Sequence, residues 1–436
     1  MPEVLALDVG SSSVRAQRFD ARAEPADELR QERYEGRDPD EIVGLVRKVV
    51  GGRDEAADAV GISCFGHSLL ALGRDGTPLT ELLGWRDTRS GPAAEWLRLR
   101  LDPDAVHART GGYLHPSFWP AKLAWLAETQ PEVFRDAGSF VSFPDYLHVR
   151  LFGGELRTSL SIASSTGLLD LATGRWDDEL LDVLGLDLER LPALGDEPLW
   201  FDGACSNLGA GCVGRTRAAL MVGTSGALRV LYETERPQPK AGLFLYRVDE
   251  RRVLEGGALS DGGNLRAWLN ETLAEAGGGL AERDPDDHGL TFLPFLGGER
   301  STGWDPEAKG AIAGLTFDTT PLDIRQAALE GVALRFSVIA ERLPELEAVV
   351  ATGGALLADP AWIQLMADAL ARPVTVSKVD EASLRGAAVA ALERLGLEAG
   401  EAPLGEVFHP REDRAEAYRS ARDRQQRLYE ELRGEH

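Results

Sequence analysis

Two short segments of the same design most strongly constrain how this chain can fold. Residues 4–20 run from an apolar stretch through Gly10 and three serines into a second strand-like stretch. Residues 219–232 repeat this plan around Gly223-Thr224-Ser225-Gly226. Each segment is typical of a strand, a tight turn and a returning strand. Two such units in one chain predict two structurally related halves.

The rest of the chain alternates between helix-like and strand-like patterns, which predicts an α/β fold with helices layered on sheets. Helical spacing is found over residues 42–50, 120–128, 146–151, 261–273, 321–343, 361–370 and 384–395, and short buried strands over 59–63, 348–352 and 374–376. The proline-containing stretch 192–202 interrupts this pattern. We therefore expect two domains, 1–198 and 199–436.

Charge and cysteine content exclude several partners. A net charge of −24 argues against nucleic acid, because binding a phosphate backbone requires a basic face. Cys64, Cys205 and Cys212 form no zinc-like pair and are too few for a disulfide framework, which favours a reducing compartment. No signal-peptide pattern is visible, and no apolar run approaches the about 20 residues that span a bilayer. We expect a cytoplasmic protein with no membrane partner.

The turns between the paired strands are candidates for phosphate binding. Small residues allow close backbone approach, and successive amide hydrogens can form an anion-binding concavity. Asp8 ends the first strand beside such a turn, where its carboxylate could hold a magnesium ion; the alternative is an ordinary hairpin with a turn aspartate. Gly353-Gly354 follows another buried strand and is a third such place. A GxxxxGK[ST] motif is absent from the sequence, which excludes a P-loop enzyme.

Two further groups of residues could carry chemistry. Asp202 precedes a helix rich in small residues, where it could be an N-cap or a base that accepts a proton from a substrate hydroxyl. His67, Trp85, Asp87 and Arg89 mix polar and aromatic groups, which suits a polyol ligand and equally suits an ordinary loop surface. Spacing alone does not separate these alternatives.

Taken in order, these segments resemble the FGGY carbohydrate kinases, a branch of the actin-like ATPases. Residues 8–13 look like the first phosphate motif of that family, and residues 223–225 look like the second. Residues 350–355 look like its adenosine motif, and residues 202–209 resemble the segment that contains its catalytic base. The resemblance runs from residue 5 to about residue 395.

The resemblance implies two actin-like (ribonuclease-H-like) ATPase domains that flank a central cleft, each with a mixed five-stranded sheet. It implies ATP and Mg²⁺ as cofactors, a small sugar or sugar-acid substrate, and a homodimer. Asp202 would be the catalytic base and Asp8 would hold the metal. The implied ATP contacts are Gly10, Ser11, Ser12, Ser13, Gly223, Thr224, Ser225, Gly263, Gly353, Gly354 and Ala355.

Several stretches are similar to gluconate kinases, among them His67-Ser68-Leu69 and residues 298–304. The expected reaction is therefore transfer of the ATP γ-phosphate to a terminal hydroxyl of gluconate, giving 6-phosphogluconate. The implied substrate contacts are His67, Trp85, Asp87, Arg89 and Lys122. Arg86, Arg89 and Lys122 are candidates for the cation that pairs with the substrate carboxylate, since arginine binds carboxylates in bidentate fashion.

One departure from the family leaves alternatives open. Family members commonly have a longer connection before the catalytic aspartate, including a strand that leads into it, whereas here only residues 193–201 are present, which leaves the edge of the first domain and the placement of Asp202 open. A kinase for another polyol or ketose, such as xylulose, is one alternative. A non-catalytic actin-like nucleotide-binding regulator is another, and an actin-like filament former fits the substrate segments poorly.

Overall fold

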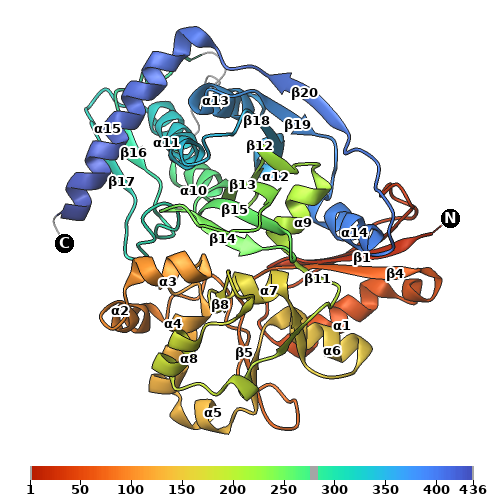
Figure 1. Cartoon of the computed structure of the whole chain (residues 1–436). Coiled ribbons are helices and arrows are strands. Elements are labelled where there is room, and N and C mark those ends of the chain that lie inside the picture. The colour runs from red at the N-terminus through yellow and green to blue at the C-terminus, as the bar shows by residue number, and fades with distance from the viewer. Residues whose placement is uncertain (1, 275–282, 435–436) are drawn as a thin grey trace.

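The computed structural model describes residues 2–274 and 283–434. Elements of the first half of the chain surround one sheet, and elements of the second half surround another (Figure 1). The α/β layering expected from the sequence is confirmed. In the part of the chain that the structure covers, no helix is long and apolar enough to cross a bilayer.

The first sheet is mixed and five-stranded, as expected. Its order is β11 (Leu199–Phe201), β4 (Ala59–Cys64), β1 (Val4–Val9), β2 (Ser13–Phe19) and β3 (Arg30–Arg33). Strand β1 pairs antiparallel with β2 across the serine turn and parallel with β4. Its residues are all buried, so the end of β1 lies at the centre of the sheet rather than at an edge.

A short strand precedes Asp202 despite the shortened connection. Strand β11 pairs parallel with β4, and Phe201 lies opposite Cys64 at the end of that strand. Three apolar residues suffice because the backbone of Ile62 also donates to the carbonyl of Pro198. The shortened connection therefore still places Asp202 at the carboxyl end of β11, beside the end of β4.

Helices and short hairpins cover the first sheet and extend it into a subdomain. Helix α1 (Pro39–Val50) begins where the Asp38 side chain accepts hydrogen bonds from the amides of Asp40 and Glu41, and it buries an apolar stripe on the sheet. The other helices are α2 (Gly91–Arg98), α3 (Pro103–Thr110), α4 (Trp119–Thr129), α5 (Pro131–Asp136), α6 (Phe143–Phe152), α7 (Leu160–Ser165) and α8 (Asp178–Leu184). The short strands are β5 (Leu70–Leu72), β6 (Ser139–Val141), β7 (Arg157–Ser159), β8 (Leu169–Asp170), β9 (Arg175–Trp176) and β10 (Ala193–Gly195).

The second sheet has seven strands rather than the five expected. Its order is β14 (Phe244–Arg247), β15 (Arg252–Leu259), β13 (Gly226–Glu233), β12 (Gly214–Val222), β18 (Ala348–Thr352), β19 (Val374–Ser377) and β20 (Leu404–Phe408). The extra strands, β14 and β20, are edge strands that pair antiparallel with one neighbour each. Strand β20 is largely exposed, so it lacks the buried apolar run that marks a central strand in sequence.

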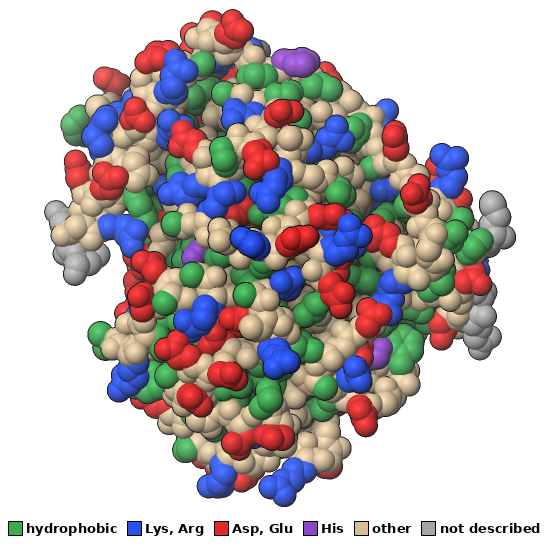
Figure 2. All heavy atoms as spheres, viewed as in Figure 1, with side chains coloured by type: hydrophobic (Ala, Val, Ile, Leu, Met, Phe, Trp, Pro, Cys, Tyr) green, Lys and Arg blue, Asp and Glu red, His purple; other side chains and the backbone are tan. Residues whose placement is uncertain are grey.

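The helices of the second half lie on both faces of its sheet (Figure 1). They are α9 (Asp202–Gly209), α10 (Gly263–Thr272), α11 (Pro321–Glu341), α12 (Gly354–Leu357), α13 (Pro360–Leu370), α14 (Ala382–Arg394) and α15 (Ala415–Gly434), with a small hairpin of β16 (Thr291–Leu293) and β17 (Ala311–Ala313). Helix α15 is rich in charged residues, and its buried residues lie on one stripe. Figure 2 shows acidic and basic side chains interspersed over this face rather than a basic patch.

Helices α9 and α14 join the two halves. They pack backbone to backbone, because a Cβ added to Gly386 would lie 1.8 Å from the carbonyl oxygen of Cys205, and one added to Gly209 would lie 1.8 Å from that of Ala382. Helix α14 also meets the first sheet, where a Cβ on Gly61 of β4 would lie 2.2 Å from the carbonyl oxygen of Ala387. One hydrophobic cluster thus contains residues of β1, α9 and α14.

Candidate active site

Residues from both halves line one cavity of about 270 Å³. It lies where the two strand-turn-strand units, the end of β4 and the start of α9 meet. Of the residues expected from the sequence to form the site, eleven line it: Asp8, Gly10, Ser11, Ser12, Ser13, His67, Trp85, Arg86, Asp202, Thr224 and Ser225. Chain segments almost 200 residues apart in sequence are therefore neighbours here.

The two glycine and hydroxyl turns are built alike. In the first, the amide of Gly10 donates to the carbonyl of Ser13 at 2.9 Å, and in the second the amide of Gly223 donates to the carbonyl of Ser225 at 3.0 Å. Each turn joins two antiparallel strands, and the first strand of each pair has a parallel neighbour, β4 or β18. The two related halves predicted from the sequence are confirmed at this level. Both turns present small residues to the cavity, which lets a ligand approach the backbone.

Asp8 reaches the cavity from the central strand of the first sheet. Its carboxylate accepts hydrogen bonds from Ser63 Oγ at 2.7 Å and from Arg15 Nη1 at 2.9 Å. Burial raises the pKa of Asp8, and the Arg15 charge opposes that rise. Arg15 is itself shared with Glu381, whose carboxylate lies 3.4 Å from its Nε. The result is a buried oxygen donor with a fixed orientation.

Asp202 is the first residue of α9 and directly follows β11. The N-cap of this helix is Phe201, and no side chain caps the helix by a hydrogen bond, so the N-cap alternative for Asp202 is not realised. Burial raises the pKa of Asp202 to about 6, with Arg229 the main opposing charge and Asp8 adding to the rise. A carboxylate with such a pKa can accept a proton near neutral pH.

His67 lines the cavity in a constrained conformation. Its backbone has a positive φ of 64°, which is uncommon for a residue other than glycine and is found often at functional sites. Its Nδ1 bonds to the carbonyl of Ser165, which leaves Nε2 as the accepting nitrogen. Burial, aided by Arg300 and Lys122, holds the pKa of His67 well below its usual value, so the ring is a neutral acceptor suited to a hydroxyl.

The structure does not bring Asp87, Arg89 or Lys122 to the cavity lining. Arg89 donates to Asp87 and to Glu81, so its charge is already paired. Lys122 is 1% exposed, and its Nζ donates to the carbonyls of His67, Leu83 and Ser117. Burial lowers the pKa of Lys122 to about 7, while three carbonyl acceptors favour its ammonium form. Lys122 thus supports the loop that carries His67, and Arg86 is the one cation of the expected three that lines the cavity.

The cavity lining also includes residues that were not assigned from the sequence, among them Arg229, Tyr246 and Arg300. The Arg300 guanidinium lies 5.2 Å from the ring centroid of Trp85 and 5.8 Å from that of Trp304, and its Nε has no hydrogen-bond partner. Among the described residues, no carboxylate lies within 4.0 Å of Arg86, Arg229 or Arg300. Arg300 lies within residues 298–304, which the sequence analysis found to be similar to gluconate kinases. That similarity could have marked Arg300 as a site residue.

The remaining expected nucleotide contacts gather beside the second turn. The amide of Gly263 donates to the carbonyl of Gly223 at 2.8 Å, and a Cβ on Gly263 would lie 2.7 Å from the Cβ of Ala355. Gly353 has a positive φ of 88°, and a Cβ there would lie 2.5 Å from the carbonyl oxygen of Val222. Gly354 opens α12 with open space where a side chain would stand. These residues form one glycine-rich corner outside the cavity lining.

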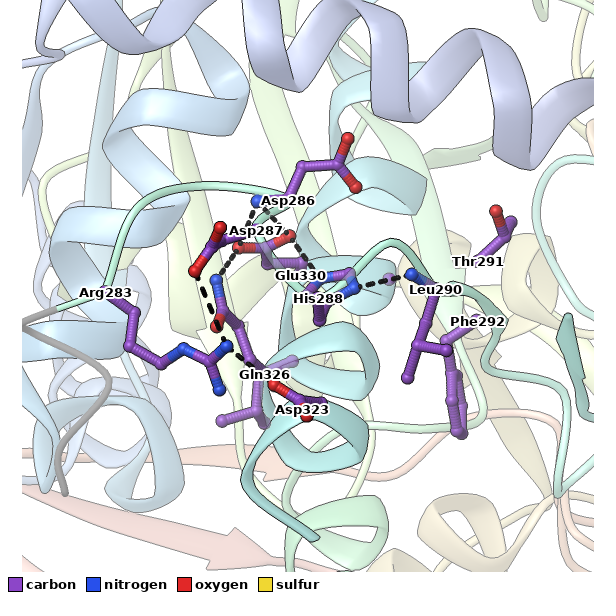
Figure 3. Close-up of polar contacts among 12 residues, drawn as sticks. Arg283, Asp286, Asp287, His288, Leu290, Thr291, Phe292, Asp323, Gln326 and Glu330 are labelled. Atoms are coloured by element: carbon purple, nitrogen blue, oxygen red, sulfur yellow. Dashed lines mark hydrogen bonds and ion pairs between the residues drawn. The ribbon is translucent and has the colours of Figure 1, made fainter. Parts of the chain in front are cut away.

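Asp286, His288 and Glu330 form a separate cluster whose ligand atoms lie within 4.8 Å of one another (Figure 3). His288 Nδ1 accepts a hydrogen bond from the amide of Leu290, so Nε2 carries the proton and donates to Glu330 at 3.1 Å. A metal ion would need the lone pair that this tautomer places on Nδ1. Glu330 also accepts from the amide of Asp286. The cluster therefore ties the segment before β16 to α11.

Comparison with known proteins identifies the family. The FGGY family of carbohydrate kinases matches through its N-terminal domain at residues 3–198 and through its C-terminal domain at residues 218–393. A gluconokinase of Bacillus licheniformis is 27% identical over 90% of this chain and 88% of its own length.

Two solved structures from Lactobacillus acidophilus superpose on the fold. A gluconate kinase does so with a TM-score of 0.89 and 27% identity, and a ligand-bound xylulose kinase with a TM-score of 0.89 and 26% identity. Each alignment covers 99% of this chain and 98% of the other. Since both domains of the family match in order and together span most of the chain, the protein belongs to the FGGY family of carbohydrate kinases.

Proposed function

We propose that this FGGY sugar kinase transfers the γ-phosphate of ATP to a terminal hydroxyl of a sugar acid, with gluconate as the substrate and 6-phosphogluconate as the product. The observation that carries the proposal is the unpaired Arg300 guanidinium on the cavity wall, beside Trp85 and Trp304. A partly buried cation without an acidic partner favours an anionic ligand, and arginine binds a carboxylate with two parallel hydrogen bonds. Similarity to gluconokinases supports the same substrate.

The remaining lining residues fit the other requirements of phosphoryl transfer. Asp202 would accept the proton of the attacking hydroxyl, and the turns at 10–13 and 223–225 would donate hydrogen bonds to phosphate oxygens. His67 and Trp85 would bind the polyol chain through one acceptor nitrogen and one apolar ring face. Such reactions depend mainly on positioning and on electrostatic stabilisation.

Magnesium is the expected companion of ATP. Asp8 suits it, because the ion prefers carboxylate oxygens and usually keeps several waters, and this carboxylate is buried at the cavity edge with a fixed orientation. When bound, the ion would neutralise charge on the phosphate oxygens. Ser63 and Arg15 would keep the Asp8 carboxylate in place for it.

A kinase for a neutral ketose such as xylulose is the second candidate. The observation that favours it is the equal TM-score of the xylulose kinase structure. A neutral sugar, however, would leave Arg300 without a charged partner, which is unfavourable in a partly buried site.

The test measures ADP release with ATP, Mg²⁺ and gluconate, xylulose, ribulose or glycerol. We expect kcat/KM for gluconate to exceed the others by more than about tenfold, because the buried cation is satisfied only by an acid. Arg300→Met should raise the KM for gluconate by about 10- to 100-fold, the value of a charge-assisted hydrogen bond. Arg100→Met is the matched control, since Arg100 also stacks on a tryptophan but is exposed.

The outcomes separate the candidates. Preference for a ketose, with no effect of Arg300→Met on its KM, would overturn the sugar-acid assignment and leave the kinase intact. Binding of ATP without phosphorylation of any sugar would favour a nucleotide-binding regulator instead.

A further inference from the structure

Arg229 stands at the reacting end of the cavity without a partner. It lies in β13, three residues after the glycine that ends the second phosphate turn, and is 5% exposed. Its Nε and Nη2 have no hydrogen-bond partner, and in the described part of the chain no carboxylate comes within 4.0 Å of it. An unpaired buried guanidinium is costly, so its presence in the cavity wall calls for a role.

The surrounding backbone is shaped to admit this side chain. A Cβ on Gly203 would lie 2.6 Å from Arg229 Nη1, and a Cβ on Gly256 would lie 2.9 Å from its Cγ. Gly203 directly follows Asp202 in the first turn of α9. The two glycines thus leave room for the guanidinium next to the residue that would accept the substrate proton.

The charged and titratable groups whose charges influence Asp202, or are influenced by it, come from five elements. They are Arg229 on β13, Asp8 on β1, Cys64 on β4, Cys205 on α9 and Arg300 on the loop after β16. Burial raises the pKa of both thiols well above the usual value, so they stay neutral. Of the two cations, Arg229 lowers the pKa of Asp202 more strongly than Arg300 does.

We propose that Arg229 is a positioning residue whose charge keeps the Asp202 carboxylate ionised when the polyanionic nucleotide enters the cavity. Asp8 repels a charge on Asp202, and ATP would stay a net anion even with one Mg²⁺ bound, so its phosphates would add further negative charge beside it. Without a fixed cation on its other side, Asp202 would take up a proton before the hydroxyl could deliver one. The inference rests on Asp202 as the base, but not on which sugar is bound.

The test compares the pH dependence of kcat in Arg229→Met, Arg229→Lys and the unaltered enzyme, with whichever sugar is phosphorylated fastest. The acid limb of kcat reports the pKa of Asp202 with both substrates bound. In Arg229→Met it should move to higher pH by about 1 unit or more, because a cation that stabilised the carboxylate is gone. Arg229→Lys should restore most of the original profile. Arg217→Met, on the exposed part of the neighbouring strand, removes the same charge and should leave the profile unchanged.

Three results would count against the inference. An unmoved acid limb in Arg229→Met, with kcat reduced equally at every pH, would make Arg229 structural. An unmoved limb with a raised KM for ATP would make it a phosphate ligand. An active Asp202→Asn would remove the proposed base and with it this inference, but it would leave the sugar-acid kinase assignment, which the substrate panel tests, so the two failures are distinguishable.

Discussion

At the scale of single residues, the structure and the sequence prediction differ over which cationic side chains lack a partner in the site. Arg89 is paired with Asp87 two residues away, and the ammonium of Lys122 donates to backbone carbonyls, whereas Arg229 and Arg300 have no acidic partner within residues 2–274 and 283–434. Whether a basic side chain has a partner depends on segments distant in sequence, such as Leu83 and Ser117 around Lys122. Residue type and spacing therefore predicted that both turns and Asp202 lie together at one cavity, but not which cations on its wall lack a partner.

Asp202→Asn tests the proposed base at this scale. The change keeps the size of the side chain and removes its ability to accept a proton. We expect kcat to fall by about 10²- to 10⁴-fold, with ATP affinity by calorimetry nearly unchanged. Asp196→Asn is the control, because that side chain is 95% exposed just before β11. Normal turnover in Asp202→Asn would exclude it as the base.

At the scale of elements, periodicity located the long helices well because their apolar stripes are buried. Helix α13 (Pro360–Leu370) was expected at residues 361–370, and the strand-turn-strand units were found at both places. The short strand β11 and the edge strands β14 and β20 were missed. A strand of three residues, or one exposed at a sheet edge, has too few buried apolar residues to give a recognisable hydrophobic pattern in the sequence. Such a strand is recognised only from the strand it pairs with in the structure.

Gly386→Ala tests the backbone contact between α9 and α14. The added methyl would meet backbone atoms of Cys205, which cannot move without displacing α9, so we expect a loss of about 1 to 3 kcal/mol in stability. Thermal unfolding would register this as a drop of several degrees. Gly44→Ala is the matched control: it lies within α1, has open space around it, and should gain about 0.5 to 1 kcal/mol. Equal melting temperatures for the two variants would contradict the close packing.

At the scale of the whole molecule, the cavity is formed by both halves, so substrates that contact each of them should draw the halves together. The two related halves and the family could be foreseen from the order of motifs. The homodimer, the cytoplasmic location and the domain limits at 198 and 199 stay predictions.

Small-angle X-ray scattering tests this closure. With gluconate and a non-hydrolysable ATP analogue together, we expect the radius of gyration to fall by a few per cent relative to the free protein. Either ligand alone should have a smaller effect, because each contacts fewer groups of the opposite half. Scattering curves that superpose in all four states would show that the halves are rigid.

The contact of α14 with the first sheet has a consequence for how the chain is made. Strands β1 and β4 are complete within the first 64 residues, yet the helix that covers part of their face lies at residues 382–394. During synthesis on the ribosome, part of the apolar surface of the N-terminal sheet therefore stays exposed until α14 has been made, which is near the end of the chain. Nascent chains stalled before residue 382 should be the ones that chaperones retain.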